Sequence, residues 1–237
     1  MFSQRLCVFA ANLALLVFST AAGAARIAID VGHYHKKPGA ISARGVAEFN
    51  YNLRLAKDIE TALKREGHST MLIGDDGRSE NLGSRAPRAN GWDLFISIHH
   101  DSVQSRFIEP WIFEGEARGY SDRFSGFSLF VSRLHPNVAA SLKCASAIGA
   151  ALRGEGFTPS RYHADPVQGE NRPFADEVNG VHYFDNLAVL KTARVPALLF
   201  EAGVIVNRDE ELVMRDPAAR AKIAAAVVSG VASCLTK

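Results

Sequence analysis

The sequence has almost no net charge: 27 Lys and Arg residues stand against 25 Asp and Glu residues, which gives +2 formally. Loss of the first 24 residues, whose one charged residue is Arg5, would lower this to +1. A balance so close to zero gives no support for nucleic-acid binding. Internal repeats, low-complexity tracts and long linkers are also missing. We therefore expect one domain with a sizeable core.

Long apolar segments are missing after the N-terminal region. There, Arg5 precedes an apolar stretch from Leu6 to Phe18, and the small residues Ala22-Gly23-Ala24 follow. This order is typical of a secretory signal peptide. A retained membrane anchor is the alternative, but the stretch is shorter than the ~20 residues that span a bilayer. We expect cleavage after Ala24, a mature domain over residues 25–237 without a membrane anchor, and a periplasmic or extracellular location.

Cysteine is scarce, with three residues in the whole chain. Cys7 lies in the predicted signal peptide, which leaves Cys144 and Cys234. An exported protein can pair two such residues in a disulfide. Both also lie in helix-like stretches, so free buried thiols are an open alternative.

Stretches with strand character alternate with helical stretches along the rest of the chain. The expected strands are residues 26–33, 69–74, 93–99, 106–114, 127–133 and 195–203. The expected helices are residues 46–65, 138–153 and 217–235. Residues 154–184 have little periodicity and are expected to form a long loop or a short inserted element. Alternation of this kind predicts a three-layer α/β fold with a largely parallel sheet flanked by helices.

Polar side chains stand at or just after the expected strand ends or helix starts: His33, Glu48, His99 or its neighbour His100, and Glu201. In α/β sheets, ligands bind beyond the carboxyl ends of the strands. Zinc takes His nitrogen and carboxylate oxygen, and a further carboxylate can act as a general base toward water. Two histidines and two glutamates therefore meet the needs of metal-assisted hydrolysis.

Each of these residues also has a simpler explanation. Glu48 lies in the first turn of a predicted helix, where carboxylates favour the positive helix end. Glu201 is more informative because it directly follows the apolar run Ala197 to Phe200, and a buried carboxylate needs a partner or a function. Successive side chains of a regular strand point to opposite faces. His99 and His100 are therefore not expected to bind the same metal, and this argument alone does not choose between them.

Four motifs in a fixed order carry a resemblance to a known family. They are Asp30-Val-Gly-His33; Gly45-Val-Ala-Glu48 with Asn52 and Leu53; Arg85 and Asn90 before Ser97-Ile-His99; and Pro196, Leu199, Glu201, Gly203 and Asn207. Together they resemble the zinc-dependent N-acetylmuramoyl-L-alanine amidases, which cut peptidoglycan in bacterial cell walls. The resemblance spans Ile27 to Met214.

The resemblance implies that His33, Glu48 and His99 hold zinc and that Glu201 is the catalytic carboxylate. It implies a mixed sheet of about six strands. It also implies hydrolysis of the amide that joins N-acetylmuramic acid to L-alanine of the stem peptide, with peptidoglycan as the partner. A different zinc hydrolase, such as a peptidase acting on stem peptides, is one alternative. A non-catalytic wall-binding protein with a decayed site is another.

The sequence departs from the family pattern at several positions. Tyr34 and His35 replace a usual Gly-Gly pair, which should narrow the mouth of the site and could bring His35 near the metal. His100 replaces a small residue and is expected to be a packing or rim residue. Some family members carry an inserted helix that plugs the zinc site until an activator protein removes it. Within residues 154–184, Glu170 or Glu177 could play that role, and a substrate-lining loop is the alternative.

Overall fold

A computed structural model describes residues 23–235. Most of the predicted signal peptide lies outside this range, and the expected cleavage site after Ala24 lies at its edge. Nine strands are present in this described part: β1 (Arg26–Val31), β2 (Ser69–Ile73), β3 (Leu94–Asp101), β4 (Glu109–Phe113), β5 (Glu116–Tyr120), β6 (Ser128–Val131), β7 (Phe174–Asp176), β8 (Val181–Tyr183) and β9 (Ala197–Val204). The α-helices of the same part are α1 (Glu48–Arg65), α2 (Val138–Gly154), α3 (Ala188–Thr192), α4 (Arg208–Arg215) and α5 (Pro217–Leu235).

Seven of the strands form one mixed sheet in the order β2-β1-β3-β9-β6-β8-β7. The strands β2, β1, β3 and β9 run parallel, whereas β6 pairs antiparallel with β9. The central strands are buried along nearly their whole length, because helices and turns cover both faces. The predicted fold class, a mostly parallel mixed sheet flanked by helices, is confirmed.

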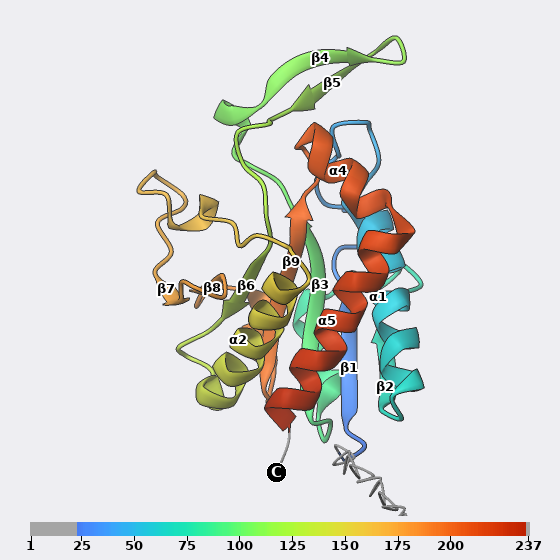
Figure 1. Ribbon diagram of the computed structural model, residues 1–237, viewed down its shortest axis with the longest axis vertical. Coiled ribbons are helices and arrows are strands. Elements are labelled where there is room, and N and C mark those ends of the chain that lie inside the picture. Colours follow the sequence, from blue (N-terminus) through green and yellow to red (C-terminus); the bar gives the residue numbers. More distant parts are fainter. Residues whose placement is uncertain (1–22, 236–237) are drawn as a thin grey trace, which may run out of the picture.

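The larger apolar core lies between the sheet and the helices α1, α2 and α5 (Figure 1). A smaller core on the opposite face includes Phe95, Phe130 and Leu190 and involves α3. Helix α5 is long and apolar enough to cross a membrane, but buried core helices share that composition. It packs along α2, and Gly230 permits close contact because a Cβ there would lie 2.6 Å from Cα of Ile148.

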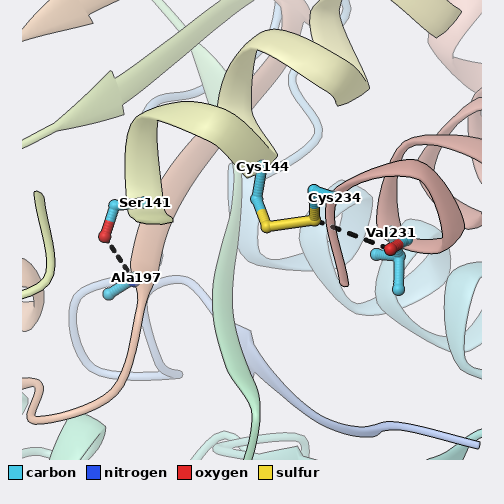
Figure 2. Close-up of a disulfide and its surroundings, with 5 residues drawn as sticks. All are labelled: Ser141, Cys144, Ala197, Val231 and Cys234. Carbon is cyan, nitrogen blue, oxygen red and sulfur yellow. Dashed lines mark hydrogen bonds between the residues drawn. A yellow bond between two sulfur atoms is a disulfide. The ribbon is translucent and has the colours of Figure 1, made fainter. Parts of the chain in front are cut away.

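Cys144 on α2 and Cys234 on α5 form a disulfide with their Cα atoms 4.9 Å apart (Figure 2). Of the two alternatives left open by the sequence, the paired state is therefore present. Near this bond, the backbone N–H of Ala197 donates to Oγ of Ser141 at 2.9 Å. This hydrogen bond fastens α2 to the start of β9.

Residues 154–184 are more regular than the sequence indicated. They contain β7 and β8, and β8 pairs parallel with β6 in the main sheet. Of the two expected alternatives, a long loop or a short inserted element, the second half of this segment forms a short element. Strands of three residues are too short to show a two-residue period in the sequence.

Strands β4 and β5 form a separate antiparallel hairpin that stands beyond the carboxyl end of the main sheet, at the top of Figure 1. Phe113 pairs with Glu116 across the turn, so Glu114 and Gly115 are its two central residues. Both have positive φ, 50° and 80°. This is the backbone of a type I′ turn, whose twist matches that of the flanking strands. Strand β4 was predictable from the sequence, whereas β5 was not among the expected strands.

Candidate metal centre

His33 follows β1 and has a φ of 68°, in the left-handed region that non-glycine residues seldom occupy. Its conformation is stabilised by Arg85, whose guanidinium donates to the carbonyl oxygen of His33. The preceding Gly32 allows another close contact, because a Cβ there would lie 2.4 Å from the ring of His99. The glycine of the Asp-x-Gly-His motif therefore makes room for a second histidine.

Arg85 belongs to a buried network that was not predicted from the sequence. Its Nη1 lies 3.0 Å from Oδ1 of Asp30, and both side chains are 1% exposed. Ser97 donates from Oγ to the other carboxylate oxygen of Asp30 at 2.6 Å. A buried charge needs a partner, and each of these has one. The network joins β1, β3 and the loop that carries His33.

Glu48 is the first residue of α1, and its carboxylate is buried between two histidines. Oε2 lies 2.9 Å from Nε2 of His33, and Oε1 lies 3.1 Å from Nδ1 of His99. The side chain of Asn52 and the backbone N–H of Ala40 each donate to this carboxylate at 3.1 Å. Burial alone would raise the pKa of Glu48, but its hydrogen bonds to His33 and His99 outweigh burial and hold that pKa well below its usual range.

The neighbouring histidines at the end of β3 have different surroundings. His99 faces His33, with ring centroids 5.0 Å apart. His100 is buried, and its Nδ1 lies 2.8 Å from Oδ1 of Asn52. Burial lowers the pKa of His100 to about 3, so its ring stays neutral. His99 shares a site with His33 and Glu48, and His100 is a packing residue.

The strand around these two histidines is not regular. The alternation of side chains predicted that His99 and His100 point to opposite faces of the sheet. Both rings instead contact residues of α1, one turn apart, at Glu48 and Asn52. The pairing of β3 with β9 shifts register between His99 and Asp101, and a bulge of this kind breaks strict alternation.

Ligand atoms of His33, Glu48 and His99 all lie within 4.8 Å of one another. Imidazole nitrogen and carboxylate oxygen are the donors that zinc takes, and a catalytic zinc site commonly has three protein ligands. The three side chains therefore fit a zinc ion in both chemistry and spacing. Whether they bind it stays a prediction.

Glu201 lies on β9 directly beside His99 in the strand register. Its Oε2 is buried and has no hydrogen-bond partner among residues 23–235. Burial raises the pKa of Glu201 well above its ordinary value, and the nearby charges of Asp101 and Glu48 raise it further. A carboxyl of this kind holds a proton readily and is suited to proton transfer.

The other candidates from the sequence lie outside this group. His35 is exposed and packs its ring against Phe49, with the centroids 5.0 Å apart, so it does not take the position near the metal that its sequence place allowed. Glu170 forms ion pairs with His163 and Arg172. Neither His35 nor Glu170 belongs to the group of His33, Glu48 and His99.

Glu177 also has a partner elsewhere, because its Oε1 lies 2.6 Å from Nη2 of Arg161. Neither of the two glutamates that were considered as plugs therefore contacts the candidate metal ligands in this structure. Residues 154–184 instead contribute two strands to the sheet. The loop before these strands is held by His163, whose Nε2 lies 2.7 Å from Oδ2 of Asp101.

Comparisons with known proteins agree with this geometry. The sequence matches the N-acetylmuramoyl-L-alanine amidase family over residues 27–233. It is 24% identical over 228 residues to the N-acetylmuramoyl-L-alanine amidase AmiC of Neisseria meningitidis, covering 86% of this chain and 51% of that protein. The chain spans about half the length of the curated relatives it matches.

Solved structures share the fold. The amidase Ami1 of Mycobacterium smegmatis superposes with a TM-score of 0.71 at 22% identity, over 92% of this chain and 99% of that one. The CwlD amidase of Clostridioides difficile, solved in complex with the GerS lipoprotein, gives 0.61 at 20% identity, over 89% and 98% of the two chains. Since the family match covers most of the sequence, this chain belongs to the N-acetylmuramoyl-L-alanine amidase family.

Proposed function

We propose that the protein is an exported zinc hydrolase that cleaves the amide between N-acetylmuramic acid and L-alanine in peptidoglycan. The observation that carries this proposal is the convergence of His33, Glu48 and His99 beside the buried carboxyl of Glu201. These residues lie at the carboxyl ends of β1, β3 and β9 or at the start of α1, where α/β sheets bind their ligands. Membership of the family supplies the substrate class.

In this proposal His33, Glu48 and His99 are the metal ligands. Zinc, when bound there, would polarise the scissile carbonyl and activate a water molecule. Asn52 and the backbone of Ala40 orient the carboxylate of Glu48, and such supporting hydrogen bonds tune a metal site.

Glu201 would accept the proton of the attacking water and pass it to the nitrogen of the leaving amine. That second transfer is needed because an amide anion is a very poor leaving group. Burial raises the pKa of Glu201. Its carboxyl group can therefore keep the proton between the two transfers.

Product analysis of digested peptidoglycan tests the proposal. We expect intact stem peptides with a free L-alanine amino group, together with glycan strands that have lost their peptides. The variant Glu201→Gln should bind zinc and release no peptide. Glu177→Gln is the matched control, since Glu177 is an exposed carboxylate paired with Arg161, and it should keep activity. Cleavage within the stem peptide would instead support a zinc peptidase, and wall binding without any product would support a non-catalytic protein.

Export and an activator protein are further parts of the proposal. The N-terminal pattern supports a signal peptide cleaved after Ala24, which would place the mature chain with its substrate outside the cytoplasm. A family structure contains a lipoprotein bound to the amidase, which supports regulation by a protein partner. N-terminal sequencing of the protein secreted by its host would test the cleavage site.

A further inference from the structure

A groove with a volume of about 440 Å³ lies between the β4–β5 hairpin and the loop that joins His33 to Glu48. Its walls are mainly apolar and polar uncharged, and they include Ala40, Ile41, Ser102, Ile108, Ala117 and Arg118. The groove borders the candidate metal centre through one of its lining residues. Ala40, which lines it, donates its backbone N–H to the carboxylate of Glu48 at 3.1 Å. Ser102 follows the candidate ligand His99 by three residues.

Arg118 on β5 is the charged residue of this groove. Its guanidinium lies over Gly45, where a Cβ would come within 2.6 Å of Cζ. Gly45 has a φ of 86°, and the absence of a side chain there leaves room for the arginine. Arg118 is therefore fixed by packing in a position that faces the groove, and the glycine of the Gly-x-x-Glu motif makes this position accessible.

Arg118 has no carboxylate partner within residues 23–235, unlike Arg44 and Arg208 beside the same hairpin. Arg44 pairs with Glu211 at 2.8 Å, and Arg208 pairs with Asp122. Ion pairs in the described part of the chain do not include Arg118, and its buried Nε has no hydrogen-bond partner there. The guanidinium thus offers a positive charge and a planar set of donors to a carboxylate from outside the chain.

We propose that this groove binds the stem peptide on the amine side of the scissile amide and that Arg118 pairs with a carboxylate of that peptide. The inference rests on the proposed function and deepens it. Stem peptides join small apolar alanine residues to an acidic residue, so their chemistry matches the groove. Ile41, Ile108 and Ala117 contact the alanine side chains, and Arg118 recognises the free carboxylate of the glutamate that follows L-alanine.

A binding experiment with released stem peptides tests this inference without requiring hydrolysis. The probes are the tripeptide L-Ala-D-isoglutamate-L-Lys and its amidated form, in which D-isoglutamine replaces D-isoglutamate. Isothermal titration calorimetry measures the Kd of each for the zinc-loaded protein. We expect the free acid to bind about tenfold more tightly, since a charge-assisted hydrogen bond contributes about 1.4 kcal/mol or more. Higher salt should reduce the difference.

The variant Arg118→Gln should lose this preference, and Arg118→Lys should keep part of it. Arg88→Gln is the matched control, because Arg88 is exposed in a short 3₁₀ helix, does not line the groove, and its loss changes the net charge equally. It should discriminate as the wild type does. Circular dichroism and thermal unfolding show whether each variant is folded.

Equal affinity of the wild-type protein for the two tripeptides, or no binding of either, would overturn the inference. So would a preference that survives in a folded Arg118→Gln variant. The proposed function fails separately, when peptidoglycan digestion yields no peptide with a free L-alanine amine. A protein that hydrolyses the wall and does not discriminate between the tripeptides would refute the groove assignment alone.

Discussion

Removal of the disulfide between Cys144 and Cys234 is expected to lower stability strongly and to leave the candidate metal centre intact. The bond joins residues 90 positions apart in the sequence. In the chain-entropy description, closing a loop of that size lowers the entropy of the unfolded state and so raises its free energy by about 4–5 kcal/mol at 25 °C. A domain of this kind is stable by only about 5–15 kcal/mol, so the bond supplies a large share of the total.

Urea unfolding followed by circular dichroism measures the effect. Oxidised wild-type protein is compared with the same protein reduced and with the double variant Cys144→Ala, Cys234→Ala. Reduction keeps both sulfur atoms, which separates the loss of the cross-link from the loss of packing. Because both cysteines are buried, the double variant should be less stable than the reduced protein.

The reduced protein should still bind metal. The disulfide joins α2 to the C-terminal end of α5, whereas the candidate ligands lie at the carboxyl ends of the strands, at the other end of the sheet (Figure 1). The expected magnitude follows from the size of the closed loop. A difference below about 1 kcal/mol between the free energies of unfolding of the oxidised and reduced proteins would therefore refute the entropic reasoning. Loss of metal on reduction alone would refute the separation of the two regions.

Three other changes test the interior. Gly32→Ala should displace the ring of His99, from which its Cβ would lie 2.4 Å, and lower zinc affinity by about 10–100-fold in a competition titration with a chelator; unchanged affinity would show that the ring can move freely. Arg85→Ala leaves Asp30 buried without its charge partner, so the free energy of unfolding in urea should fall by about 3–5 kcal/mol, and a loss within 1 kcal/mol would contradict the buried network. Burial lowers the pKa of His182 from 6.5 to about 4. As the pH falls, the unfolded state therefore binds a proton at a higher pH than the folded state does. The stability that is present above pH 6.5 is lost as the pH falls toward 4. His182→Phe should remove about 3 kcal/mol of that acid sensitivity, and identical pH profiles of the two proteins would be evidence against this assignment.

The regular elements of the fold were predictable because their patterns are long. The apolar residues of α1 recur at helical spacing over 18 residues, and β1 and β3 are continuous apolar runs. Alternation of such elements indicates an α/β sheet, and the sheet places the ends of β1, β3 and β9 close together. This is why residues far apart in the sequence, such as His33 and His99, could be assigned to one site.

Short and irregular features were not predictable for physical reasons. The strand β5 has the sequence Glu-Ala-Arg-Gly-Tyr, which shows no apolar alternation, and none of its five residues is fully buried. The bulge after His99 depends on how β9 pairs with β3, which a single sequence does not encode locally. The partner of Asp30 is 55 residues away, so the structural role of Arg85 emerges only when the chain is folded.

The pairing of the two cysteines illustrates the same limit. Both residues lie on apolar helices, and a buried thiol packs there as well as half of a disulfide does. Only the approach of α5 to α2, helped by Gly230, brings the two Cα atoms within disulfide range. The sequence thus indicated the candidate side chains, and tertiary packing decided which of them meet.

The metal content of purified protein tests the central assignment most directly. We expect about one equivalent of zinc in the wild type by inductively coupled plasma mass spectrometry, as three ligands with one open position imply. The variant His99→Ala should lose the metal. The variant His35→Ala, which changes an exposed histidine outside the ligand group, should retain it. Retention of a full equivalent by a folded His99→Ala variant would contradict the assignment of His33, Glu48 and His99 as the ligands.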